Sequence, residues 1–183
     1  MIRTLTLLCC LSGTAATADI LGLNDYDALF ADPATEVTIL DDGSEAIEID
    51  GQIQISRNDD RITTLDITNT GAVGCFVQIL SQIEAYQSAC DDPIEAEFME
   101  NHRTYLDRIL AFYAANTAPV SDVATVRQRY DAYVEATTQN ARQYCAGDGQ
   151  VETFMRSVLA ASTAAAVDQM TSTPRLPADN PCI

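Results

Sequence analysis

Four cysteines outside the first 18 residues have the greatest potential for chemistry in this chain: Cys75, Cys90, Cys145 and Cys182. Cysteine thiolates can bind zinc, exchange electrons or form disulfides. Zinc-ribbon and thioredoxin-like sites use a C-x-x-C spacing, which these four cysteines lack, and the chain has only one histidine to complete a ligand set. The spacing therefore favours two disulfide bonds over a metal or redox centre.

His102 is the only histidine, so a Ser/His/Asp triad would have to use it. It lies between Phe98 and Tyr105 on the apolar face of a predicted helix, and no G-x-S-x-G motif supplies a serine nucleophile. A lone histidine on such a face is more often a core residue that is bonded to a neighbour. The acid pairs Asp91/Asp92 and Glu95/Glu97 are best explained as helix caps and as charges that interact favourably with the helix dipole. The sequence therefore identifies no catalytic residue.

Three tyrosines, Tyr130, Tyr133 and Tyr144, recur on one predicted helix. One interpretation is an amphipathic core with the hydroxyl groups at its rim. The other is a surface that, together with His102, binds a ligand or a partner. The spacing of the tyrosines does not decide between these two interpretations.

The charge of the chain restricts its partners. There are 27 acidic residues against ten basic ones, all of them arginine, and the formal net charge is −17. Such a field repels nucleic acid and attracts cations or a basic protein or peptide. The absence of lysine excludes Schiff-base chemistry and a phosphate-loop lysine. We predict a protein or peptide partner of unknown identity, with a basic one favoured by charge, and no nucleic acid.

Calcium is the most natural cation for so acidic a chain, but the EF-hand pattern fails. Asp25 and Asp27 have the right spacing to Glu36, whereas Leu29 and Phe30 occupy the positions of a ligand and of the turn glycine. We predict no cofactor and no metal, with weak calcium binding in the acidic loops as the alternative.

Residues 1–18 have the organisation of a secretory signal peptide. A basic start is followed by an apolar run over residues 5–11 and by Ala16-Thr17-Ala18, an A-x-A cleavage site. No later stretch approaches the roughly 20 apolar residues that a membrane-spanning helix needs. We expect export to the periplasm, with residues 19–183 as a single globular unit.

Residues 19–68 are acidic and predict a small antiparallel sheet of two or three strands, after a short helical turn at residues 25–30. The isoleucines between residues 47 and 55 alternate with polar residues. A three-residue hairpin loop beginning at Asp50-Gly51 would pair Ile49 with Ile53 and keep the apolar face together. One long strand that is kinked at Gly51 has the same parity and stays open.

Residues 69–171 change to the period of a helix, and they predict four helices that begin near Ala72, at residues 91–93, at Ser121 and near residues 148–149. Asn69 or Thr70 is expected to cap the first helix. Short connections imply antiparallel neighbours. We therefore predict an α+β protein, in which the sheet is followed by an up-and-down four-helix bundle and by a proline-rich tail over residues 172–183.

The order of these helices predicts how the cysteines pair. An up-and-down path places Cys90 and Cys145 at one end of the bundle, and it places Cys75 and Cys182 at the other end. The alternative Cys75–Cys90 bond would have to span about 22 Å along one helix, well beyond the ~7 Å limit between Cα atoms. We predict Cys90–Cys145 and Cys75–Cys182.

These observations favour a secreted, non-catalytic binding or interaction protein. Two alternatives remain from the sequence: a hydrolase of the cell envelope that uses carboxylates we cannot rank, and a weak cation-binding module. A catalytic site would bring His102 or two carboxylates together in a cleft. A binding protein would instead expose an apolar or tyrosine-lined patch.

Overall fold

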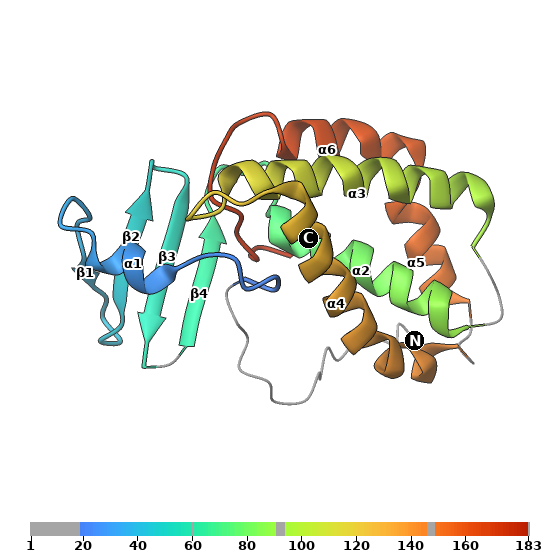
Figure 1. Ribbon diagram of the computed structural model, residues 1–183, viewed down its shortest axis with the longest axis horizontal. Coiled ribbons are helices and arrows are strands. Elements are labelled where there is room, and N and C mark those ends of the chain that lie inside the picture. The colour runs from blue at the N-terminus through green and yellow to red at the C-terminus, as the bar shows by residue number, and fades with distance from the viewer. Residues whose placement is uncertain (1–18, 60, 91–93, 146–148, 183) are drawn as a thin grey trace, which may run out of the picture.

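A computed structural model of the chain describes residues 19–59, 61–90, 94–145 and 149–182, and it has the predicted α+β architecture (Figure 1). An antiparallel sheet precedes a group of helices, and two disulfides connect distant parts of the chain. The sheet has four strands, in the order β1-β2-β3-β4, rather than the two or three that the sequence predicted.

The strands are β1 (Thr38–Ile39), β2 (Glu45–Ile49), β3 (Ile53–Asn58) and β4 (Arg61–Asp66). All of the pairings are antiparallel. The extra strand is short, because a turn that contains Gly43, with φ of 84°, folds β1 back onto β2 after only two residues.

The hairpin between β2 and β3 has the predicted register. Ile49 pairs with Ile53, so the loop between them has three residues, and Ile47 pairs with Ile55. Asp50 and Gly51 both have positive φ, which favours glycine and tolerates aspartate. The hairpin, and not a single kinked strand, therefore keeps the isoleucines on one face.

A short helix, α1 (Tyr26–Ala31), confirms the helical turn that the sequence predicted at residues 25–30. The Asp25 carboxylate accepts a hydrogen bond from the Ala28 amide at 2.9 Å and caps this helix. The buried side of α1 contributes to a small hydrophobic core with the sheet and the C-terminal tail, formed by Tyr26, Phe30, Ile47, Ile53, Ile55, Leu176 and Ala178.

The larger core lies among the helices α2 (Val73–Ala89), α3 (Ala96–Asn116) and α4 (Val123–Ala141). The Asp122 carboxylate caps α4 by accepting from the Thr125 amide at 3.0 Å. The expected cap of α2 was wrong, because Ala72 occupies that position without a side-chain bond and the Thr70 hydroxyl accepts from Arg175 instead.

The predicted start of α3 at residues 91–93 lies outside the described residues. Glu95 occupies the N-cap position.

The fourth predicted helix is broken in two. A helix α5 (Gln150–Val158) is followed by a 3-10 turn, η2 (Ala161–Thr163), and by α6 (Ala164–Met170). Two polar side chains of α3 explain the break. The Asn101 amide donates to the Leu159 carbonyl at 2.9 Å, and the Tyr105 hydroxyl donates to the Ala160 carbonyl at 2.8 Å. These carbonyls are thus satisfied without a continuous helix.

Both predicted disulfides are present. The Cα atoms of Cys75 and Cys182 lie 5.2 Å apart, and those of Cys90 and Cys145 lie 5.3 Å apart. Cys75 is in the first turn of α2, and Cys145 follows the 3-10 turn η1 (Arg142–Tyr144) at the end of α4. The up-and-down order of the helices is what brings the members of each pair together.

The tail after α6 returns to the junction between the sheet and the helices (Figure 1). The Asn180 carbonyl accepts from the Asp66 amide at 2.7 Å, at the end of β4. The Ala178 carbonyl accepts from the Gly74 amide at 2.8 Å, at the start of α2. The tail therefore bonds to both parts of the fold. In the described part of the chain, no helix is long and apolar enough to span a bilayer.

Candidate functional site

His102 lies in the helical core, with 2 % of its surface exposed. Its Nε2 lies 3.0 Å from the Leu80 carbonyl oxygen. Since a carbonyl can only accept, Nε2 carries the ring proton. Burial lowers the pKa of His102, with the Leu80 carbonyl opposing that effect. The ring is therefore neutral near pH 7, and it packs in the core away from solvent.

The three tyrosines of the sequence hypothesis do not form one surface. Tyr130 is fully buried, and its hydroxyl donates to the Glu84 carboxylate at 2.9 Å. Tyr133 is half-buried, whereas Tyr144 is 47 % exposed. Burial of Tyr130 and His102 removes both from any contact with a partner. Of the residues predicted to form a ligand-binding or partner-binding surface, only Tyr133 and Tyr144 remain accessible.

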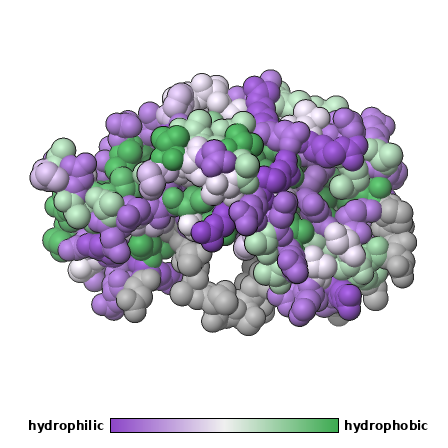
Figure 2. Space-filling view, in the orientation of Figure 1, coloured by the Kyte–Doolittle hydropathy of each residue, from purple (hydrophilic) through white to green (hydrophobic). Residues whose placement is uncertain are grey.

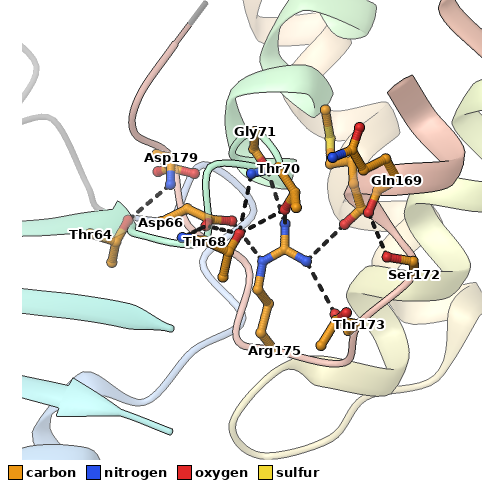
Figure 3. A network of polar contacts seen from close by, with 11 residues as sticks. Thr64, Asp66, Thr68, Thr70, Gly71, Gln169, Ser172, Thr173, Arg175 and Asp179 are labelled. Carbon is orange, nitrogen blue, oxygen red and sulfur yellow. Dashed lines mark hydrogen bonds and ion pairs between the residues drawn. The ribbon is translucent and has the colours of Figure 1, made fainter. Parts of the chain in front are cut away.

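A polar network that the sequence analysis missed surrounds Arg175, in the tail (Figure 3). Its Nε donates to Asp66 at 2.6 Å, and both side chains are only 1 % exposed. The remaining nitrogens donate to the Thr70 hydroxyl and to backbone carbonyls of Met170, Thr173 and Gly71. The Asp66 carboxylate also accepts from the amide and hydroxyl of Thr68.

This network joins β4, the β4–α2 connection and the tail. The guanidinium also lies 5.7 Å from the centre of the Phe112 ring, on α3. Because the guanidinium is surrounded by these partners and is buried, it can position chain segments but has no free position for a substrate. The feature of the sequence that could have pointed to this network is the single arginine between two prolines in the tail.

A second acidic cluster forms where the segment after residue 18 meets the tail. Asp19 is buried, and its carboxylate accepts from the amides of Leu21, Leu23 and Asn24, from the Asn24 side chain, and from the Tyr113 hydroxyl. Asp179 lies close to it. Both oxygens of the Asp179 carboxylate are buried and have no hydrogen-bond partner of normal geometry. Burial, reinforced by the charge of Asp19, raises the pKa of Asp179 to about 8.

An open depression of about 430 Å³ is lined mainly by the same N-terminal segment. Its lining combines backbone with apolar and acidic side chains: Gly22, Leu23, Asn24, Asp25, Tyr26, Asp27 and Ile62. The residues from 22 to 27 come from the start of the described chain and from α1, and Ile62 comes from β4. Its volume falls within the range of small-ligand and peptide side-chain sites.

The part of the chain that lines this depression is rich in acidic residues. Residues 19–66 contain thirteen acidic residues against only two arginines. Arg57 already has partners within the protein. It forms ion pairs with Glu45 at 2.6 Å and with Asp27 at 3.1 Å, and its guanidinium lies over the Phe30 ring. Figure 2 shows hydrophobic residues over the sheet end of the molecule, interspersed with hydrophilic ones. Val37, Ile39, Leu65 and Ile67 are exposed in and beside the strands.

Among the described residues, no group of three or more His, Cys, Asp and Glu side chains is arranged to hold a metal ion. Comparisons with protein-family models, with curated proteins and with solved structures give no match for this chain.

Proposed function

We propose that the chain is an exported, non-catalytic binding protein, and that the depression lined by residues 22–27 and Ile62 contacts a basic partner. The observation that carries this proposal is the combination of an open, partly apolar depression with acidic side chains at its wall. Leu23 and Ile62 offer apolar contact. Asp25, which caps α1, and Asp27, which also pairs with Arg57, are exposed and offer negative charge. An Arg or Lys side chain matches both, because its aliphatic stem can pack while its charged head stays near the carboxylates.

Export is the first part of this proposal. Residues 1–18 have the order of a signal peptide, and two disulfides persist in an oxidising compartment such as the periplasm. Expression with the native leader should yield a periplasmic chain that begins at Asp19 and has no free thiol. Intact mass, measured with and without alkylation, tests this part. A cytoplasmic chain with its leader intact and reduced cysteines would refute it.

The binding part is tested by charge reversal. We expect Asp27→Arg to weaken capture of a basic partner at least ten-fold, because the Asp27 side chain is 90 % exposed beside the depression. Asp41→Arg is the matched control, since it adds the same charge in the exposed β1–β2 turn. The oxidised protein and both variants would be immobilised and compared in pull-downs from periplasmic extract at low and at high salt.

The outcome of this comparison separates a local site from a general field effect. Specific loss in Asp27→Arg, with capture retained in Asp41→Arg, supports a site at the depression. Equal loss in both variants would show that only the net charge matters. Unchanged capture in both would place the partner elsewhere, and Tyr144 would then be the next residue to test.

A further inference from the structure

The Asp179 carboxylate is buried in this fold without a cation. Neither oxygen has a hydrogen-bond partner of normal geometry, although the Ile20 amide lies near enough to lower its pKa. The carboxylate also packs tightly onto Gly74 at the start of α2, where a β-carbon would overlap it. An unpaired buried carboxylate is strongly destabilising when it is ionised. The site therefore lacks a positive charge.

The backbone of residues 19 and 20 lies beside this carboxylate. Five donors fix the Asp19 side chain, at distances of 2.6 to 3.1 Å. The Ile20 amide lies near enough to Asp179 to lower its pKa, and the nitrogen of Asp19 lies about 3–4 Å from the Ile20 nitrogen along the backbone. Asp19 is also the first residue after the A-x-A sequence at residues 16–18.

We propose that removal of residues 1–18 creates an α-ammonium group on Asp19 that forms a buried ion pair with Asp179. This inference rests on the proposed export and cleavage. Cleavage turns a neutral amide nitrogen into a cation beside a buried carboxyl group that has no other cation, and the new positive charge favours ionisation of that group. The Asp19 carboxylate does not compete strongly for this cation, because donors from Leu21, Leu23, Asn24 and Tyr113 already surround it.

None of the described titratable groups that interact with Asp179 carries a positive charge, so the new ammonium group would be its cation. Within the described part of the chain, the titratable groups that interact with Asp179 are Asp19, Tyr26 of α1, Tyr113 of α3 and Tyr133 of α4. Burial raises the pKa of all three tyrosines, so they remain neutral near pH 7. The pair would join the new N-terminus to the tail, which Cys182 holds to α2. Processing would thus complete the junction between the sheet and the helices.

The composition of the chain makes the proposed amine uniquely measurable. The sequence has no lysine, so the α-amino group is the only primary amine of the processed protein. We expect an acylating reagent at pH 7.5 to modify this amine at least ten-fold more slowly in the native wild type than in native Asp179→Asn. Pairing raises the pKa of the amine by one unit or more above its usual value near 8, which lowers the reactive fraction about ten-fold.

A stability measurement gives an independent result. In the processed chain, Asp179→Asn should lower the thermal midpoint by about 5 °C or more, because it leaves the ammonium unpaired. In a chain with Gly-Ser ahead of Asp19, the same substitution should leave the midpoint unchanged or raise it, because it removes an unpaired carboxylate. Asp41→Asn, in an exposed turn, is the control and should have no effect in either chain.

Intact mass separates failure of the inference from failure of the proposed export. If the exported chain begins at another residue, the proposed cleavage is wrong and the ion pair with it. If it begins at Asp19 but the amine reacts equally fast in wild type and Asp179→Asn, the ion pair is absent. Should Asp179→Asn fail to fold, a titration of the ¹³C-dimethylated wild-type amine decides, and an ordinary pKa near 8 would overturn the proposal.

Discussion

At the scale of single residues, Arg175 and Asp66 form a buried ion pair in which all the guanidinium nitrogens of Arg175 donate hydrogen bonds. Both side chains are removed from water, so the pair persists only because each remaining hydrogen-bond position is occupied. The pair joins the end of the sheet to the tail. It therefore specifies which segments meet rather than adding large net stability, because the cost of removing both charges from water offsets most of their attraction.

We predict that Arg175→Met lowers the free energy of unfolding by about 3–5 kcal/mol, because it leaves the Asp66 carboxylate buried without its cation. Urea denaturation measures this loss. The control is Arg103→Met, in an exposed pair with Glu100, which should cost less than about 1 kcal/mol. Similar losses in the two variants would show that the buried pair has no special role. Combining Arg175→Met with Asp66→Asn should cost less than the sum of the single changes.

His102 provides a pH prediction at the same scale. Burial lowers its pKa below 6.5, so between the lowered value and 6.5 the unfolded chain binds a proton that the native chain does not. The stabilisation is complete above pH 6.5 and is lost as the pH falls below it. We expect the stability advantage of wild type over His102→Gln to shrink by about 1 kcal/mol between pH 7.5 and 5.5.

Urea denaturation of both proteins at the two pH values measures this difference. His102 is the only histidine, so the comparison isolates its titration. An advantage that is equal at both pH values would mean that folding does not lower the pKa of His102.

At the scale of elements, α3 determines where the last helical segment breaks. Asn101 and Tyr105 lie one helical turn apart on α3, and each donates to a carbonyl of the segment between α5 and α6. The helical period of residues 149–171 predicts one helix, because periodicity reports only which residues face a core. The break depends on donors from a different helix, which a local pattern does not include.

We predict that Tyr105→Phe lowers the free energy of unfolding by about 1 kcal/mol, because the Ala160 carbonyl loses its donor while the packing of the ring is kept. Tyr144→Phe, on an exposed ring, is the control and should have no measurable effect. Urea denaturation compares the two. Equal stability of wild type and Tyr105→Phe would show that this bond does not define the break.

At the scale of the whole molecule, the two disulfides fasten segments that the chain order separates widely. Cys75 and Cys182 are 107 residues apart, and Cys90 and Cys145 are 55 apart. The first fastens the tail to α2, where the tail also contacts β4. The second fastens the end of α2 to the end of α4.

We predict that replacing either pair by alanine lowers the free energy of unfolding by up to about 4–5 kcal/mol, because loops of this length gain much entropy when opened. Urea midpoints of Cys75→Ala/Cys182→Ala and Cys90→Ala/Cys145→Ala measure the two losses. Wild type under reducing conditions should be less stable than either variant. Midpoints equal to that of oxidised wild type would contradict this expectation.

The sequence by itself determined the α+β class, both disulfides, and the register that a hairpin at Asp50-Gly51 would have. That residues 47–55 form this hairpin and not one kinked strand was decided only by the structure. The class and the register follow from local periodicity, and the disulfide pairing follows from the order of helices joined by short connections. Both can be deduced from the chain without knowledge of its tertiary contacts. Tertiary structure alone decided that Arg175 meets Asp66, that Asp179 lies beside Asp19, and that Tyr130 is buried while Tyr144 is exposed. Those contacts join residues as many as 160 positions apart, and their geometry depends on how the sheet, the helices and the tail pack together.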